Sequence, residues 1–333
     1  MTSFTLAEVR EKTYKKRDAW WTVFIVDPLA SRLVVWTANR TGITPNQITF
    51  GAGILGLAAA VCFALASWPL LVAGAVLFHL SFVLDCMDGK IARLKRNGSV
   101  FGGWVDFIFD RVRFFGCMMA LLIGQWVATG QAVYLLLAPV VTFLDLMRYL
   151  NGAQVAKTRQ SMREKLRAAA RGRDVGATMD DDPESTETQR EPGADGAGGD
   201  EGQSEPIIFK EEAQRDHPDA APEHVYATAG ARLVDVHKGF SARFTWYERF
   251  RSTLLRGRVR PHLFSGIEFE MFICVLAPLT ALVALVTALP SLIIAVTVFS
   301  CAALAAFELL IVYKLWLATR DFGVELRRLR SEH

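Results

Sequence analysis

The sequence lacks the features of a disulfide-stabilised secreted protein. It has only five cysteines among 333 residues, and all five fall in apolar runs without paired spacing. This pattern disfavours a disulfide framework or a cysteine-bound metal, and favours reduced cysteines that pack between helices. The N-terminus has no basic, apolar and small-residue tripartite pattern, so we expect no cleaved signal peptide. No internal repeat is visible.

Charged residues are scarce in several long apolar runs. Hydrophobic residues make up 52% of the chain, and the mean hydropathy is +0.25. A helix needs about 20 apolar residues to span a bilayer, and several runs reach that length. We therefore predict an all-α integral membrane protein with six transmembrane helices. They are placed near residues 48–67, 70–94, 102–127, 131–152, 267–288 and 291–316.

Lysine and arginine are absent from the three turns at 67–69, 128–130 and 289–290. The opposite side holds the basic segments, which are the N-terminus, 90–96, 157–173, 249–260 and 320–330. Basic loops stay in the cytoplasm, so both termini are predicted to be cytoplasmic. Because basic flanks are expected beside membrane spans, these segments predict no nucleic-acid partner.

The chain divides into five predicted segments. Residues 1–44 form interfacial and juxtamembrane helices, and 45–155 contain the first four transmembrane helices with the motif described below. Residues 156–262 form a cytoplasmic insertion, 263–320 contain the last two transmembrane helices, and 321–333 form a cytoplasmic tail.

Two of these segments have a distinctive composition. Basic residues lead into Trp20 and Trp21, which suits a helix lying in the membrane interface, although a solvated helix packed on the protein would look similar. Residues 174–206 have almost no apolar residues and are predicted to be disordered. Residues 207–262 regain apolar residues and are predicted to form a cytoplasmic helix that returns the chain to the bilayer.

Four carboxylates stand between the second and third predicted transmembrane helices. Asp85 and Asp88 are three residues apart, and Asp106 and Asp110 are four apart. Either spacing places both side chains on one face of a helix. Facing helices would bring all four together, where hard divalent cations could neutralise them. The alternative is that the carboxylates form structural salt bridges with arginines, namely Arg93, Arg111 and Arg113.

This stretch resembles a known family motif. The pattern Asp85-x-x-Asp88-Gly89-x-x-Ala92-Arg93, eight residues, then Gly102-x-x-x-Asp106-x-x-x-Asp110 matches the motif of the CDP-alcohol phosphotransferase (CDP-alcohol phosphatidyltransferase) family. Pro45-Asn46-x-x-Thr49 is similar to another family feature. The resemblance covers about 1–155 and 263–320, but not the insertion.

The resemblance implies a transferase that moves a substituted phosphate from a CDP-linked donor to an alcohol and releases CMP. The expected donor is CDP-diacylglycerol, which implies a role in phospholipid synthesis. Two Mg²⁺ or Mn²⁺ ions would be bound by carboxylates, and one carboxylate would also act as the catalytic base. The metal ligands would be Asp85, Asp88, Asp106 and Asp110, with Asp110 as the base. Residues at the nucleotide and its diphosphate would be Gly89, Ala92, Arg93, Gly102, Asn46 and Thr49. The family also implies a homodimer.

The acceptor is less clear from the sequence. Family members with phosphorylated acceptors place arginines around the fourth and fifth transmembrane helices, and this chain has Arg148 there. Glu268 and Glu270 open the fifth helix, where a phosphate would need cations. These two glutamates could recognise a hydroxyl-rich or amino acceptor, or they could be interfacial residues without a ligand.

Three other functions are consistent with parts of the pattern. A water-soluble CDP-alcohol could be the donor in the same chemistry. A cation-coupled transporter could also use intramembrane carboxylates, and an inactive protein could use the insertion as a docking segment. We expect the protein in a bacterial plasma membrane with its active site facing the cytoplasm.

Overall fold

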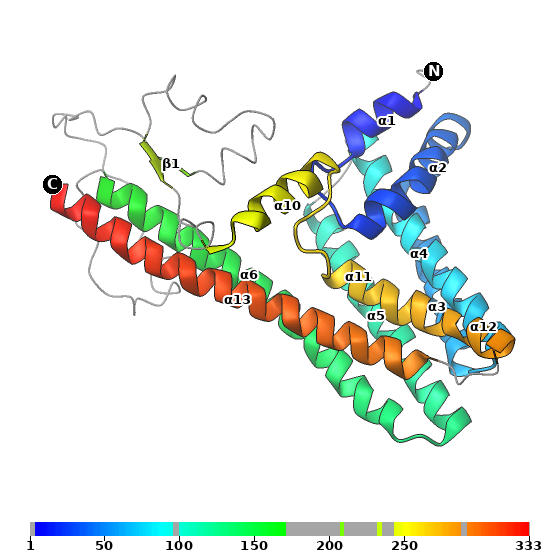
Figure 1. Ribbon diagram of the computed structural model, residues 1–333. Coiled ribbons are helices and arrows are strands. Elements are labelled where there is room, and N and C mark those ends of the chain that lie inside the picture. Colours follow the sequence, from blue (N-terminus) through cyan, green and yellow to red (C-terminus); the bar gives the residue numbers. More distant parts are fainter. Residues whose placement is uncertain are drawn as a thin grey trace. The chain divides into compact units, whose positions relative to one another are not determined.

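The structure of this chain is a computed structural model that describes residues 4–95, 100–170, 207–209, 232–234, 243–287 and 292–332 (Figure 1). Its helices are α1 (Leu6–Thr13), η1 (Thr22–Val26), α2 (Asp27–Arg40), α3 (Pro45–Ala64), α4 (Trp68–Lys95), α5 (Val100–Thr129), α6 (Val133–Ala170), α10 (Thr245–Arg256), α11 (Gly266–Met271), η3 (Phe272–Leu276), α12 (Ala277–Thr287) and α13 (Ile293–Glu332). The segments η1 and η3 are π-helical. The chain forms two compact units, Met1–Asn151 with Arg249–Leu310, and Gly152–Glu248 with Ile311–His333.

Within the part of the chain that the structure describes, five stretches of helix are long and apolar enough to cross a membrane: Pro45–Ala64, Trp68–Lys95, Val133–Ala169, Gly266–Val286 and Ile293–Leu329. They coincide with five of the six predicted spans. The predicted span at 102–127 corresponds to α5, which is a 30-residue helix but is not among the five. Charged residues are concentrated in its N-terminal half, namely Asp106, Asp110, Arg111 and Arg113. The helical part of the fold prediction is therefore confirmed, and five spans rather than six meet the criteria of length and composition.

The N-terminal helices show why these residues fold locally. The Thr5 hydroxyl accepts a hydrogen bond from the Glu8 amide at 3.3 Å, and the Glu8 carboxylate accepts one from the Thr5 amide at 2.9 Å. This capping box satisfies backbone donors at the start of α1. Phe24 and Trp36 are exposed, whereas Trp21, one of the two tryptophans on which the prediction of an interfacial helix rests, is only 6% exposed. Residence in that interface stays a prediction.

The insertion differs from its predicted form. The predicted disordered segment 174–206 lies outside the described residues. The helix predicted over 207–262 is wrong for part of that range, because β1 (Ile207–Phe209) and β2 (Arg232–Val234) form a two-stranded parallel sheet with Ile207 opposite Arg232. The β-branched residues of these strands favour extended backbone. Among the described residues of this range, the predicted helix is present as α10.

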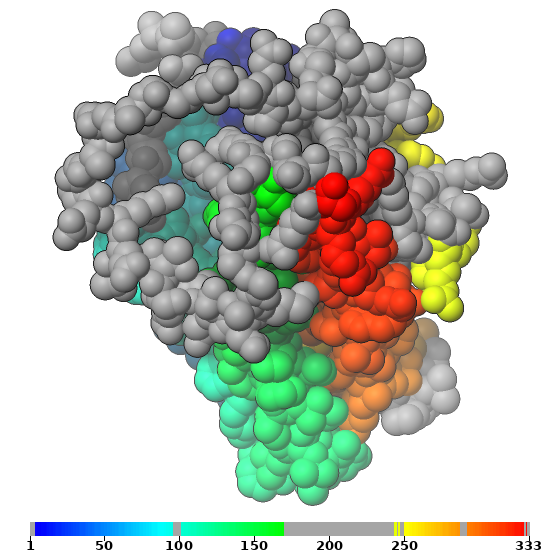
Figure 2. All heavy atoms as spheres, turned by 90° about the vertical axis from the view of Figure 1, so that its left-hand side faces the viewer, coloured from blue at the N-terminus to red at the C-terminus, as the bar shows by residue number. Residues whose placement is uncertain are grey.

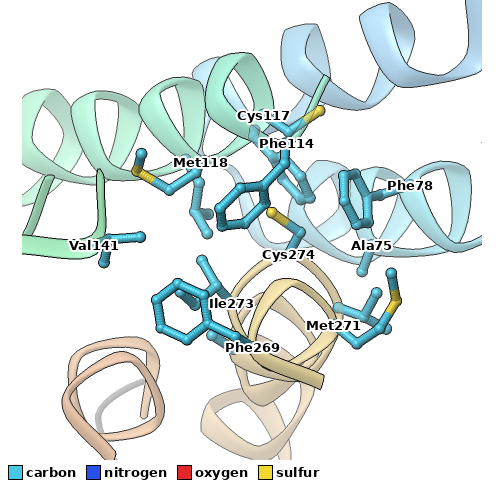
Figure 3. Packing of buried hydrophobic residues seen from close by; sticks show 14 of the residues in the cluster. Ala75, Phe78, Phe114, Cys117, Met118, Val141, Phe269, Met271, Ile273 and Cys274 are labelled. Atoms are coloured by element: carbon cyan, nitrogen blue, oxygen red, sulfur yellow. The ribbon is translucent and has the colours of Figure 1, made fainter. Parts of the chain in front are cut away.

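The core of the first unit is formed by side chains from several helices. Figure 3 shows Phe78 of α4, Phe114 of α5, and Phe269 and Cys274 of the α11–η3 run around one cluster. The rings of Phe114 and Phe269 meet edge to face with centroids 6.1 Å apart, a favourable arrangement for aromatic pairs. All five cysteines are free, as predicted. This cluster joins α5 to α11 directly beside the charged segment of α5.

The second unit has its own apolar contact. Figures 1 and 2 show the C-terminal halves of α6 and α13 side by side. Their buried contact residues are Met162, Leu166, Ala169, Ala318, Phe322 and Leu329. α6 thus continues as one helix past residue 152, where the predicted fourth span ends, and the apolar face of this continuation packs on α13.

Gly124 of α5 packs closely against the end of α3. A Cβ atom at Gly124 would lie 2.5 Å from the Phe63 carbonyl oxygen and 2.8 Å from that of Ala64. Both are backbone atoms in a helix and cannot move easily. The absence of a side chain at 124 is therefore required for this helix contact.

We predict that Gly124→Ala destabilises the folded protein by about 1–3 kcal/mol, because the added methyl group forces α3 and α5 apart. The measurement is the thermal unfolding midpoint of the purified protein in detergent. Gly116→Ala is a matched control on the same helix, because a Cβ there would meet nothing within 4 Å. Equal midpoints for the two variants would contradict the prediction.

Candidate active site

Three of the four predicted carboxylates form a group between α4 and α5. Asp85 and Asp88 lie in the C-terminal part of α4, and Asp106 lies in the N-terminal part of α5. One carboxylate oxygen from each lies within 4.8 Å of the other two. The helical spacing read from the sequence therefore does bring carboxylates from two helices together.

The donor set fits a divalent cation. Oxygen atoms bound to one ion lie at most about twice the metal–oxygen distance apart, which is about 4.2 Å for Mg²⁺ and about 5 Å for a larger ion. The Asp85, Asp88 and Asp106 oxygens fall in this range. Carboxylates are the ligands that hard cations prefer. These three side chains could hold a metal ion after small rotations.

Asp110, the fourth carboxylate, is held by Arg113. The Arg113 guanidinium donates to Asp110 at 2.5 Å and to Asp85 at 3.3 Å, so it bridges α5 and α4. The salt-bridge alternative therefore holds for two of the four carboxylates, and Arg113 forms those bridges. One guanidinium cannot neutralise four carboxylates, so negative charge remains that a metal ion would balance.

Gly56 makes room for Arg113, a role that the sequence did not reveal. A Cβ atom at Gly56 would lie 2.9 Å from both Cγ and Cδ of Arg113. Arg113 also donates to the hydroxyl of Ser81 at 3.4 Å. Gly56 lies outside the motif, and nothing in the sequence distinguishes it from the other glycines of α3. The close approach could therefore be found only in three dimensions.

Thr49 contacts Asp88, one of the candidate metal ligands. Its hydroxyl donates a hydrogen bond to the Asp88 carboxylate and lies 3.1 Å from the Pro45 carbonyl oxygen. Thr44 and Gln47 form a capping box at the start of α3, which fixes the first turn of the helix that carries Thr49. Asn46 in the same turn is exposed. Of the two nucleotide candidates at the start of α3, Thr49 is hydrogen-bonded to Asp88, and Asn46 is exposed.

The other residues predicted to lie at the nucleotide and its diphosphate are on an open face. A Cβ atom at Gly89 would meet, among the described residues, only Arg93 Nη1 at 3.8 Å. Arg93 and Gly102 are exposed, and Ala92 is half-buried. Gly89 is therefore not explained by close helix packing, in contrast to Gly124. An open glycine beside the carboxylates leaves space for a ligand to approach the backbone.

The predicted acceptor residues form a separate polar network around Arg111. Arg111 pairs with Glu270 at 2.5 Å and with Asp145 at 3.2 Å, and its guanidinium lies 4.5 Å from the Tyr149 ring centroid. Arg148 stacks on the same ring from 5.3 Å. Arg111 thus joins α5 to α6 and α11.

The two glutamates of α11 are both buried. Glu268 is 0% and Glu270 is 2% exposed. Glu268 accepts hydrogen bonds from the amide and hydroxyl of Ser265 at 3.1 and 3.0 Å. Glu268 therefore caps α11, whereas Glu270 and Arg148 stay in the network beside Asp110 and Arg113.

Comparison with known proteins gives a consistent result. A family model described as CDP-alcohol phosphatidyltransferase matches residues 42–172, which include α3, α4 and α5. The chain is 37% identical over 108 residues to a phosphatidylinositol phosphate synthase from Mycobacteroides abscessus, covering 32% of this chain and 44% of that protein. It is 33% identical over 121 residues to a bifunctional IPC transferase and DIPP synthase from Thermococcus kodakarensis, covering 36% of this chain and 25% of that protein.

The chain spans less than half the length of these curated relatives. The matched region contains the four carboxylates, Thr49 and Arg113, but neither α11 nor α13. Together with the five helices of spanning length, the match identifies an integral membrane protein.

We predict that Thr49→Val lowers the affinity for Mn²⁺ about 10-fold, because loss of a hydrogen bond to a metal ligand typically costs 10–100-fold. Valine keeps the shape of threonine but cannot donate to Asp88. The measurement is Mn²⁺ binding by electron paramagnetic resonance with detergent-purified protein. Thr49→Ser retains the hydroxyl and serves as the control. Wild-type affinity in Thr49→Val would contradict the role assigned to Thr49.

Proposed function

We propose, from the match of residues 42–172 to the family model described as CDP-alcohol phosphatidyltransferase, that this membrane protein transfers a phosphatidyl group from CDP-diacylglycerol to an acceptor alcohol and releases CMP. The observation that carries the proposal is the group of Asp85, Asp88 and Asp106, with Asp110 fixed beside it by Arg113. The product would be a phospholipid with a phosphodiester headgroup.

The four carboxylates divide the chemistry among them. Asp85, Asp88 and Asp106 would hold Mg²⁺ or Mn²⁺, and two ions would be held if Asp110 also contributes a ligand. Bound divalent ions would supply positive charge for the donor diphosphate and for the attacking and leaving oxygens. The face of α4 at Gly89 would admit the cytidine diphosphate, with Arg93 and Gly102 beside it.

Asp110 would act as the base. The acceptor oxygen attacks the phosphatidyl phosphorus, the bond from that phosphorus to the CMP oxygen breaks, and the acceptor proton passes to Asp110. Arg113, which contacts both Asp110 and Asp85, would orient Asp110 for this step. The proton acceptor would then lie next to the group that would bind the donor.

The continuity of the helices favours an enzyme over a cation-coupled transporter. Transporters of that class bind ions near the membrane centre, on helices that are broken there. Here α4 is continuous over Trp68–Lys95 and α5 is continuous over Val100–Thr129. All four carboxylates lie in the C-terminal half of α4 or the N-terminal half of α5, on either side of the segment that connects the two helices. These features support a site at the membrane boundary that a nucleotide can reach.

The proposal includes a topology. With α5 as a sixth transmembrane helix, the basic segments at the N-terminus, 90–96, 157–173, 249–260 and 320–330 fall on one side. The positive-inside rule then puts both termini and the active site on the cytoplasmic side of a bacterial plasma membrane. We propose a homodimer as the assembly, by analogy with the family.

The test of the function is CMP release by purified protein with Mg²⁺ or Mn²⁺ and CDP-diacylglycerol. Acceptors would include inositol phosphate, glycerol phosphate, serine and free inositol. We expect acceptor-dependent CMP release, and at least a 100-fold loss in Asp106→Ala, because removal of a metal ligand removes the charge stabilisation. If CMP is released only with water-soluble CDP-alcohols, the donor in the proposal changes from CDP-diacylglycerol to a water-soluble CDP-alcohol. No release from any donor by a protein that binds Mn²⁺ would refute the transferase function.

Asp110→Asn tests the base separately from the metal ligands. Asparagine has the same size as aspartate but cannot accept the acceptor proton, so we predict at least a 100-fold loss of CMP release. Binding of CDP-diacylglycerol, measured by isothermal titration, should change less than threefold. Full activity in this variant would remove Asp110 from the mechanism. Loss of donor binding along with activity would show that Asp110 acts as a ligand for the donor site instead.

A further inference from the structure

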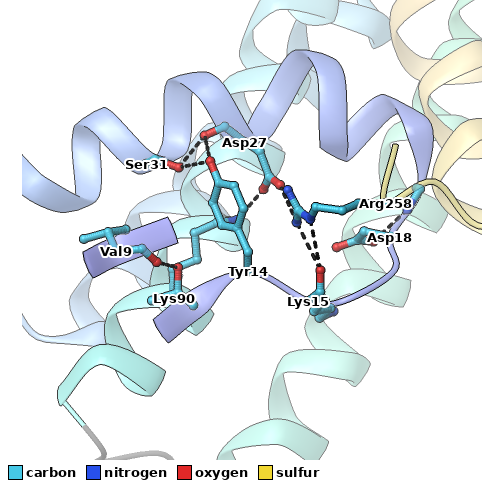
Figure 4. Close-up of polar contacts among 10 residues, drawn as sticks. Val9, Tyr14, Lys15, Asp18, Asp27, Ser31, Lys90 and Arg258 are labelled. Atoms are coloured by element: carbon cyan, nitrogen blue, oxygen red, sulfur yellow. Dashed lines mark hydrogen bonds and ion pairs between the residues drawn. The ribbon is translucent and has the colours of Figure 1, made fainter. Parts of the chain in front are cut away.

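A second buried charge cluster lies behind the catalytic turn of α4. Its centre is Asp27 at the start of α2, which is 3% exposed. One carboxylate oxygen pairs with Lys90 Nζ at 2.9 Å, and the other pairs with Arg258 Nη2 at 3.2 Å. Figure 4 shows Lys90 and Arg258 reaching Asp27 from two different segments. One carboxylate therefore binds two cations that are 168 residues apart in the sequence.

Lys90 lies at an unspecified position within the motif and faces away from the metal-ligand group. It lies two residues after Asp88 and directly after Gly89. Positions two apart point to nearly opposite sides of a helix, so Lys90 and Asp88 extend from opposite sides of the same turn. Lys90 is 4% exposed, and its ammonium is bound to Asp27. The Lys90–Asp27 pair therefore holds this turn of α4 on the side opposite to Asp85 and Asp88.

Arg258 is held in an unusual backbone conformation. It follows α10 on the way to the fifth span and has φ of 61°. Non-glycine residues adopt this region at an energetic cost and persist there when surrounding contacts hold them. Its guanidinium donates to the Lys15 carbonyl oxygen at 3.1 Å and stacks on the Tyr14 ring at 4.2 Å.

The backbone around Arg258 is also fixed. The Asp18 amide donates to the Arg258 carbonyl oxygen at 2.9 Å, and the Arg260 amide donates to the Asp18 carbonyl oxygen at 2.8 Å. These bonds tie the chain that returns from the insertion to the N-terminal segment. The Arg258 side chain then extends from this backbone clamp to Asp27.

We propose that Arg258 and Asp27 are positioning residues for the active site. Arg258, at the end of the insertion, holds Asp27, and Asp27 holds Lys90 and with it the turn that presents Asp85 and Asp88. The inference rests on the proposed function, because it assigns these residues an effect on the metal-ligand group of that site. Metal binding by the three carboxylates then depends on a side chain that follows α10.

The test is Arg258→Gly in the full-length protein. Glycine adopts a positive φ without strain, so this substitution removes the side chain while the backbone clamp can remain. We expect Mn²⁺ affinity, measured by electron paramagnetic resonance, to fall about threefold to tenfold, somewhat less than for a residue bonded directly to a ligand. The Mg²⁺ concentration for half-maximal CMP release should rise by the same factor.

Two comparisons separate positioning from general stability. Arg256→Ala removes an exposed arginine at the end of α10 and should leave both values unchanged. In a Lys90→Met background, Arg258→Gly should change the Mn²⁺ affinity by a smaller factor than it does in the wild-type background, because both cations act through Asp27. A purely structural role would lower the thermal midpoint and leave the Mn²⁺ affinity of the folded protein unchanged.

The outcomes distinguish the two proposals. Wild-type Mn²⁺ affinity in Arg258→Gly, with an active wild-type protein, would overturn the positioning role and leave the transferase function intact. A wild-type protein that neither binds Mn²⁺ nor releases CMP would overturn the function and the positioning role together.

Discussion

Four carboxylates at the α4–α5 junction repel one another, and the surrounding structure supplies only part of the compensating charge. Arg113 binds Asp85 and Asp110, and Gly56 leaves the space through which its side chain reaches them. Asp88 receives a hydrogen bond from Thr49, which orients it without adding charge. The residual negative charge is what makes a divalent cation a natural ligand here. Metal binding and helix packing are therefore coupled at this junction.

Three charged groups near the site each pair with two partners of opposite charge. Arg113 and Arg111 each bind two carboxylates, whereas Asp27 binds two cations. A buried charge is stable only when paired and hydrogen-bonded. These three groups join α2, α4, α5, α6, α11 and the segment after α10, so removing one charge would leave a partner uncompensated.

Local spacing allowed part of the site to be predicted from the sequence. The pairing of Asp85 with Asp88 on one helix, and of Asp106 with Asp110 on the next, follows from i,i+3 and i,i+4 spacing, and the structure brings Asp85, Asp88 and Asp106 together. Contacts between distant residues were not predictable. Glu270 lies 159 residues from Arg111, and neither Gly56 nor Arg258 differs in the sequence from its neighbours of the same type. The strands β1 and β2 were missed because a strand of three residues is too short to show the alternation that separates a strand from a helix.

The two ion pairs of Asp27 have a consequence for synthesis of the chain. Asp27 and Lys90 are made early and form a neutral pair by themselves, whereas Arg258 follows Lys90 by 168 residues. At about 5–20 residues per second, the ribosome needs roughly 10–30 s to reach it. During that interval Asp27 can pair with Lys90 but not with Arg258. On the proposed function, the full set of contacts that positions the metal-ligand group forms only after residue 258 has been translated.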